Sequence, residues 1–355
     1  MRPFVFSALF LTVLVPGFSQ TAVDAGSNLP KEPRAVLDAA LPFYDFSSPE
    51  LKPWHLKANY QLYDLDGKPT EQGTWEYWWA SPKVHRSDWK RADAETTEWS
   101  SADGSVYRKV IGSPLRYFER TIEETLLSPL PDRGILDSGK MKLELKMLPA
   151  KKPEFACVFT TLQWLVDGKL QAPSSGLPQE YCFEPATMAL RIAYSNQLTK
   201  QYSQLVKTQG RYLARQVVVT YGKQTLFSVS VDTIEGFNPA DATLSPAADA
   251  ILERRGASLR VSGQGEVATG SLVKKSVPVY PPISKMNGEQ GVVVLAAVIG
   301  TDGRINALEV LASPSPRLSQ SALDAVKTWE YKPYLLNGEP VEVETIVNVI
   351  FSLGR

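Results

Sequence analysis

The sequence predicts an α+β fold: a mostly antiparallel β middle domain, curved or half-barrel in shape, followed by a small ββαβ domain at the C-terminus. Three observations lead to this prediction. Residues 50–240 contain many short runs that alternate apolar and polar side chains, separated by turn signals. Within that region, Leu115–Leu127 is the one clear segment with apolar residues at helical spacing. Residues 276–355 combine two strand patterns, a helix pattern and a final alternating strand.

The chain of 355 residues is too long for one compact core, and its length predicts two domains. We expect five segments, which are a signal peptide at 1–20, a poorly patterned stretch at 21–49, a β-rich curved sheet at 50–240, a connecting segment at 241–275 and the C-terminal domain at 276–355. Within the connecting segment, Ser245–Gly256 has a helical pattern, with Pro246 near its start and Gly256 as its stop signal.

The first residues predict export from the cytoplasm. Met1-Arg2-Pro3 forms a short basic region, Phe4–Val15 an apolar run, and small residues follow at Gly17 and Ser19. This order is typical of a cleaved signal peptide. The apolar run is shorter than the roughly 20 residues that span a bilayer. An uncleaved membrane anchor stays open as the alternative.

The middle region is rich in aromatic residues, which suits a sheet too long to stay flat. Its strand order and its use of tyrosine and tryptophan resemble the curved sheet of the periplasmic lipoprotein carriers, although no sequence motif supports the likeness. Five tryptophans could line an apolar cavity for an acyl chain or, as we favour, fill the sheet core: Trp75, Trp78, Trp79, Trp89 and Trp99.

Cys157 and Cys182 both lie in strand-like sequence. Export to an oxidising compartment favours a disulfide between them, which would contribute about 3 kcal/mol. Two buried free thiols are the alternative.

The residues that catalysis or metal binding would need are sparse. The two histidines, His55 and His85, lack partners at metal-ligand spacing, and no motif brings a nucleophile beside a base. Lysine plus arginine equals aspartate plus glutamate, 38 each, which gives no argument for a nucleic-acid partner. We therefore expect a binding protein without cofactor or metal, and not an enzyme.

The C-terminal segment has the clearest local signals. A strand is predicted over Val292–Gly300, and Asp302-Gly303 indicates a tight type I′ turn to a second strand, Ile305–Ala312. Apolar residues then recur at helical spacing in Leu318–Lys327, and Val341–Phe351 alternates as a strand buried on one face.

These residues resemble the C-terminal domain of the TonB family, the energy transducers of Gram-negative envelopes. About a dozen positions carry the likeness in order: Tyr280-Pro281, Gly291, Asp302-Gly303, Ser313, Ala322, Ala325-Val326, Trp329, Tyr331, Pro333, Asn337-Gly338 and Phe351. The chain departs from TonB proper in having no long Pro/Lys-rich spacer.

The resemblance implies a periplasmic domain whose last strand offers a free edge, to which the TonB box of an outer-membrane receptor adds as a strand. The strand expected to bind the partner contains Val341, Val343, Thr345, Val347, Val349 and Phe351. The motif residues are then scaffold, with Gly303 and Gly338 at positive φ, Pro281 and Pro333 ending strand pairing, and Trp329 and Tyr331 anchoring the helix. Pairing of two copies through the same edge stays open, as does an alternative function, the carriage of lipid or another apolar ligand by the middle sheet.

Overall fold

The computed structural model describes most of the chain from residue 29 onward. The described residues are 29–64, 66–113, 115–131, 133–139, 141–148, 154–166, 169–171, 179–195, 198–241, 244–255, 272–336, 339–341 and 343–354. The predicted signal peptide and Gly338 lie outside them. No helix within these ranges is both long enough and apolar enough to cross a membrane.

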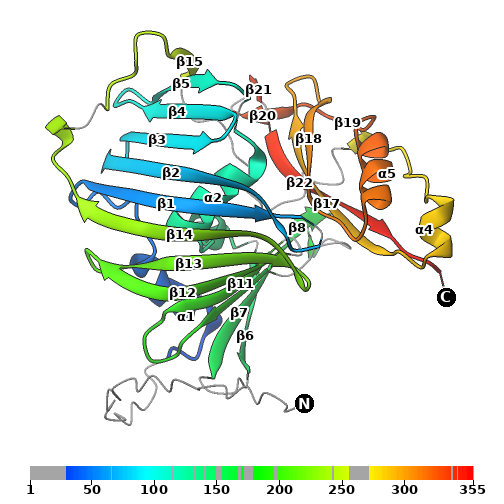
Figure 1. Cartoon of the computed structure of the whole chain (residues 1–355). Coiled ribbons are helices and arrows are strands. Elements are labelled where there is room, and N and C mark those ends of the chain that lie inside the picture. Colours follow the sequence, from blue (N-terminus) through cyan, green and yellow to red (C-terminus); the bar gives the residue numbers. More distant parts are fainter. Residues whose placement is uncertain are drawn as a thin grey trace, which may run out of the picture.

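One large open sheet of thirteen antiparallel strands dominates the described residues, and it curves around helices (Figure 1). One half of the sheet consists, in spatial order, of β15 (Ile251–Arg255), β5 (Ser105–Ile111), β4 (Ala94–Ser100), β3 (Val84–Arg91), β2 (Pro69–Ser81) and β1 (Trp54–Tyr63). The order continues with β14 (Gln224–Gly236), β13 (Arg211–Tyr221), β12 (Leu198–Thr208), β11 (Leu190–Ser195), β10 (Gln179–Phe183), β7 (Phe155–Leu162) and β6 (Met141–Leu148).

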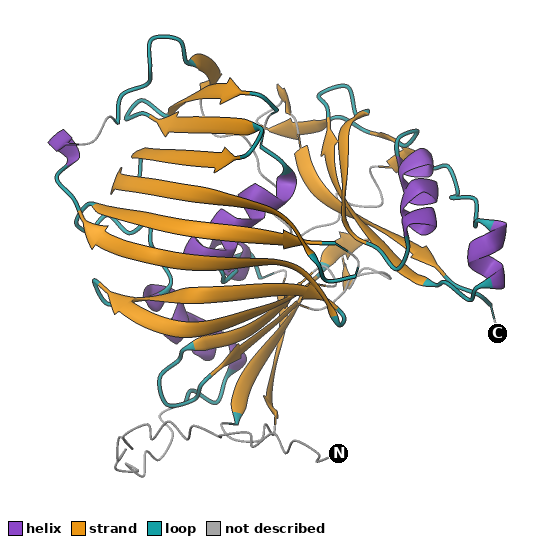
Figure 2. Ribbon diagram, viewed as in Figure 1, coloured by secondary structure: helices purple, strands orange, loops and turns teal. Residues whose placement is uncertain are grey.

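Helices lie against the concave face of this sheet (Figure 2). They are α1 (Pro33–Ala40), the 3₁₀ turn η1 (Leu41–Phe43), α2 (Tyr117–Leu127) and α3 (Arg133–Asp137). Val36 and Leu37 of α1 and Ile122 of α2 are fully buried in the same cluster as Trp54 and Trp75. The predicted antiparallel curved sheet is therefore an open sheet with a helix-covered core, and α1 belongs to that core.

The tryptophans divide between the two faces of the sheet. Trp75, Trp79 and Trp89 are buried in the core, where Trp75 stacks on Trp89 at 5.0 Å between ring centroids. Trp78 lies on the opposite face, where it stacks on His55 at 4.4 Å. Trp99 is also buried, and the Arg86 guanidinium lies 5.8 Å from its ring centroid.

Two stretches differ from the sequence-based expectation. The helical pattern of Ser245–Gly256 is misleading, since Ile251–Arg255 forms β15 and pairs with β5. The long strand β12 was not expected, because its outward positions are polar and its apolar residues are few. It nevertheless pairs with β13 along its length.

The C-terminal unit contains a three-stranded antiparallel sheet with β17 (Gly291–Ile299) between β18 (Ile305–Ala312) and β22 (Val343–Phe351). Helix α4 (Pro282–Met286) precedes this sheet, and α5 (Pro316–Val326) follows β18. The remaining short elements are η2 (Pro239–Asp241), β8 (Trp164–Val166), β9 (Lys169–Gln171), β16 (Leu272–Lys274), β19 (Glu330–Tyr331), β20 (Tyr334–Leu336) and β21 (Glu339–Val341).

The β17–β18 turn is not the predicted type I′ turn. Gly303 has φ +81°, but Asp302 is not among the described residues with positive φ. Gly303 N–H donates to Gly300 and Gly300 N–H to Arg304, so the loop needs one left-handed residue where a type I′ turn needs two.

Candidate functional site

The C-terminal sheet is covered on both faces. On one face Val293, Leu295 and Val347 pack with Leu318, Ala322 and Val326 of α5. On the other face Val294, Ala296 and Ile346 join the core of the large curved sheet. Strands can therefore be added only in the plane of the sheet, at one of its edges.

Tyr221, at the end of β13, joins the two sheets. Its hydroxyl group donates to the Val292 carbonyl oxygen at 2.6 Å and accepts from the Val292 N–H at 3.1 Å. Gly291 lies beside this contact, and a Cβ added there would come within 2.7 Å of Pro314. A side chain at Gly291 would push this junction apart.

The two bonds from Tyr221 reveal which backbone groups of β22 are free. In an antiparallel pair, hydrogen-bonded and non-hydrogen-bonded residue pairs alternate. Val292 lies opposite Ile350, but its N–H and C=O are directed to Tyr221, so this pair is not hydrogen-bonded. The register runs without a shift to Ile299 opposite Val343. Hence Ile346, Asn348 and Ile350 direct their N–H and C=O groups away from β17.

The residues that the sequence predicted for the binding edge alternate along β22 with Ile346, Asn348 and Ile350. Val343, Thr345, Val347, Val349 and Phe351 lie on β22, and their side chains are buried. By the same alternation their backbone groups bond to β17. Val341 belongs to β21 and lies opposite Tyr334, so its partner strand differs from that of Val343–Phe351. Val343–Phe351 are therefore held to β17 by the predicted residues, and the outward backbone N–H and C=O groups belong to Ile346, Asn348 and Ile350.

The edge itself is unpaired among the described residues. The sheet order is β18-β17-β22, so β22 has a strand on one side only. The Ile350 side chain is 68% exposed, whereas Ile346 is buried. The outward donor and acceptor are therefore accessible at Ile350, whereas those of Ile346 belong to a buried residue.

The described motif residues make packing contacts and hydrogen bonds within the C-terminal unit. The Tyr280 ring packs edge-on against Phe351 at 5.3 Å, and its hydroxyl group donates to the Glu289 carbonyl. Trp329 is buried against α5, and its indole N–H donates to Ser276 at 2.9 Å. Tyr331 is buried in the same cluster. Pro281 is the N-cap of α4, a helix that sequence reasoning missed, and Pro333 lies between β19 and β20.

Gly303 has a stronger constraint than its positive φ. The Tyr331 N–H donates to the Gly303 carbonyl at 2.8 Å, and the Tyr331 carbonyl lies where a Cβ on Gly303 would be. The turn is therefore packed directly against β19. Only glycine fits without moving that strand.

A carboxylate network joins α4 to α5, and sequence reasoning missed it. Glu289 accepts hydrogen bonds from Ser315 at 2.6 Å and Ser284 at 2.7 Å, and it pairs with Arg317 at 3.2 Å. The bond from Ser315, with those from Ser284 and Asn287, lowers the pKa of Glu289 to about 2. Ser315 is also the N-cap of α5, since it accepts from the Leu318 N–H.

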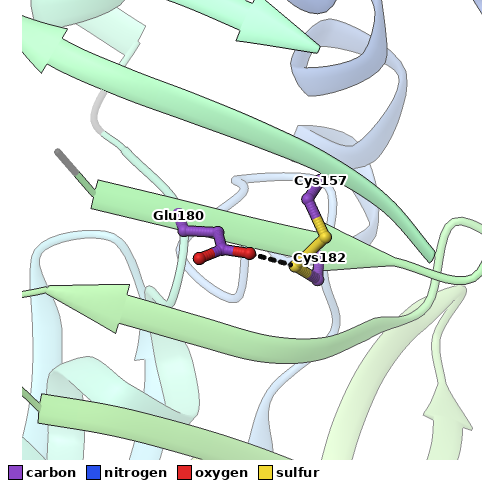
Figure 3. Close-up of side chains that lie close together, drawn as sticks. All are labelled: Cys157, Glu180 and Cys182. Atoms are coloured by element: carbon purple, nitrogen blue, oxygen red, sulfur yellow. Dashed lines mark hydrogen bonds between the residues drawn. A yellow bond between two sulfur atoms is a disulfide. The ribbon is translucent and has the colours of Figure 1, made fainter. Parts of the chain in front are cut away.

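Cys157 and Cys182 form a disulfide between the neighbouring strands β7 and β10. Glu180 Oε1 lies 3.0 Å from Cys182 Sγ (Figure 3). A disulfide sulfur carries no proton, so this contact is favourable when the carboxyl group is protonated. Burial raises the pKa of Glu180 above its usual value. Although the three side chains lie within 4.8 Å of one another, the oxidised sulfurs are not thiolate ligands.

Each of the two histidines contacts a side chain of β2. His55 Nε2 lies 3.0 Å from Glu76, and desolvation lowers the pKa of His55. His85 stacks on Tyr77 at 5.5 Å, and desolvation lowers its pKa to about 4. Both side chains are thus neutral at pH 7.

Comparison with solved structures gives distant likenesses to the larger part of the chain. A DUF1329 family protein from Desulfovibrio piger matches with a TM-score of 0.38 and 15% identity, over 60% of this chain and 95% of that protein. A LolA superfamily protein from Nitrosomonas europaea matches with a TM-score of 0.36 and 8% identity, over 60% of this chain and 97% of that one.

The C-terminal unit has a sequence relative. Protein TonB of Vibrio cholerae is 32% identical over 77 residues, which is 21% of this chain and 32% of the length of that protein. The family model described as Gram-negative bacterial TonB protein C-terminal matches residues 276–353. Residues 276–353 are therefore a TonB C-terminal domain.

Proposed function

We propose that this chain is a cell-envelope protein that binds an extended peptide of a partner by strand addition to the free edge of β22. The partner is an outer-membrane receptor with a TonB-box-like segment, in TonB-linked transport. The observation that supports this is the outward direction of the backbone groups of Asn348 and Ile350, on a strand with no neighbouring strand on that side within the described part of the chain. Main-chain bonds of this kind supply affinity in strand addition.

The arrangement of the faces supports the same proposal. The side chains of Val347 and Val349 are buried against α5, and Ile346 is buried against the curved sheet. An added strand would therefore extend a sheet whose faces are already packed. Only the edge would need to lose water, and a short peptide could bind without opening either core.

Exchange of Ile350 for proline tests the proposal. This change removes the outward N–H while leaving the bonds between β22 and β17, and proline is tolerated at an edge with its missing N–H toward solvent. We expect Ile350→Pro to weaken binding of synthetic TonB-box peptides at least tenfold, measured by calorimetry. The matched variant Ile350→Ala shortens the same side chain but keeps the N–H, and it should bind more tightly than the proline variant.

Equal affinities of the proline and alanine variants would exclude pairing at this edge. Complete absence of binding by the native chain to peptides from every receptor of the same outer membrane would exclude the TonB-box class of partner. The alternative pairing, two copies joined through β22, would appear as a dimer in analytical ultracentrifugation that Ile350→Pro dissociates.

The proposed location is the periplasm, with export by the predicted signal peptide, and the proposed role is binding without catalysis. Carriage of an apolar ligand by the middle sheet remains the alternative function. The core tryptophans do not favour it, because Trp75, Trp79 and Trp89 are packed against one another or against other buried side chains.

A further inference from the structure

A cavity of about 450 Å³ lies between the curved sheet and the TonB C-terminal domain. The curved sheet contributes Leu62 of β1 and Leu226 and Phe227 of β14, and α2 contributes Phe118. Leu311 of β18 and Leu323 of α5 form the opposite wall. The site is therefore composite, since neither unit encloses it alone.

An irregularity in β18 supplies part of the wall. The register with β17 shifts between Val294 and Leu295, so that Leu311 is an extra residue between Val310 and Ala312. A bulge of this kind redirects side chains locally. Leu311 and Ala312 both pack with the core of the curved sheet and line the cavity.

The chemistry of the walls favours an aliphatic ligand. Leucine, valine and phenylalanine supply eight of the twenty lining residues, and the volume lies within the range of roughly 300–1,000 Å³ that is usual for small-molecule sites. Polar groups are few and neutral along the α5 side, where Ser319 and Gln320 lie.

The charged lining residues do not favour an anion. Asp64 and Glu309 are acidic, and the Arg116 guanidinium already pairs with Glu71 and lies 3.8 Å from Glu119.

We propose that this junction cavity binds an uncharged molecule with a single aliphatic chain, as in a monoacylglycerol. Such a ligand contacts both walls and so strengthens the contact between the curved sheet and the TonB C-terminal domain. The inference is independent of the edge of β22, which lies outside the lining of the cavity.

The experiment is a fluorescence titration of the full chain with the neutral apolar probe N-phenyl-1-naphthylamine, followed by displacement. We expect saturable binding, displacement by a monoacylglycerol, and at least tenfold weaker displacement by the fatty acid anion of the same chain length. Leu226→Trp fills the cavity from the sheet and Leu311→Trp from β18. Each should weaken probe binding at least tenfold.

Two further variants make the result decisive. Ser319→Trp enters the cavity from a half-buried position on α5, so it keeps the test valid if Leu311→Trp does not fold. Ile251→Trp, at a position that is 72% exposed on β15, is the matched control and should bind as the native chain does. The proposal is overturned if no saturable binding occurs, if all variants bind alike, or if the fatty acid displaces as well as the monoacylglycerol.

Discussion

The Tyr221 hydroxyl group occupies the position on β17 where the next residue of a longer β18 would pair with Val292. The last β17–β18 pair in that direction is Val294 with Ala312, and Pro314, two residues further, has no N–H to donate. Tyr221 replaces it by both donating to and accepting from Val292. A residue of the curved sheet thus completes the ladder of the TonB C-terminal domain.

The first prediction concerns this contact. Tyr221→Phe removes both hydrogen bonds and leaves half-buried backbone groups of Val292 unpaired, so it should lower the free energy of unfolding by about 1–3 kcal/mol. Hydrogen exchange at the Val292 amide should accelerate, whereas exchange in β1 should not. Unchanged exchange at Val292 would contradict the role given to Tyr221.

Two adjacent prolines in β22 should have unequal effects on stability. Val349→Pro removes an N–H that bonds to β17 and cuts back a buried side chain, but Ile350→Pro removes an outward N–H and an exposed side chain. We expect the loss of unfolding free energy for Val349→Pro to be larger by about 1–3 kcal/mol, because a buried hydrogen bond is lost. Thermal unfolding of both variants measures the difference. Equal losses of unfolding free energy would contradict the assignment of the Val349 N–H to β17 and of the Ile350 N–H to the free side.

Glu119 is a fully buried carboxylate at the start of α2. It accepts from the Tyr60 hydroxyl at 2.8 Å and from Arg91 at 2.9 Å, and the Arg91 side chain is only 4% exposed. Glu119→Gln removes the buried charge partner of Arg91 and leaves it the exposed Asp93, so it should cost about 3–5 kcal/mol in denaturant unfolding. Tyr60→Phe, which leaves the ion pair intact, should cost about 1 kcal/mol. A glutamine variant as stable as the phenylalanine variant would contradict a dominant ion pair.

The Glu289 network predicts a dependence on pH. The pKa of Glu289 is about 2 in the folded chain and 4.5 ordinarily, so its stabilising contribution is complete above pH 4.5 and is lost as the pH falls toward 2. The difference in thermal midpoint between the native chain and Glu289→Gln should therefore shrink between pH 4.5 and 2.5. Glu330→Gln serves as the control in the same domain, and a difference that stays constant with pH would refute the assignment.

The sequence was most informative where local signals act alone. Helix α2 lies where apolar residues recur at helical spacing, and most strands of the curved sheet lie where apolar and polar residues alternate. Gly303 has the positive φ that its turn position predicts. Strand β15 misled because a five-residue edge strand takes its conformation from β5 and not from its own pattern. Strand β12 was missed because its many polar side chains give no clear strand pattern. It forms through backbone pairing with β11 and β13 on its two sides.

The candidate site shows a similar limit. Alternation in Val341–Phe351 identified a strand buried on one face, but it does not reveal which backbone groups are already paired. That information comes from the bond between Tyr221 and Val292, two residues 71 positions apart. The Glu289 network likewise joins residues whose sequence separation hides their contact, such as Ser315, 26 positions away.

The place of β22 at the edge of a sheet tied to the curved domain has a mechanical consequence. A strand added beside β22 and pulled along its own axis would load the hydrogen bonds of the ladder in shear, so that many must break together. The load would pass through β17 to Tyr221 and from there into β13. Resistance to tension would then depend on the Tyr221 bonds together with the packed side chains of Val294, Ala296 and Ile346. Loss of the phenol group would weaken the transmission of force to the larger sheet without removing the strand that holds the partner.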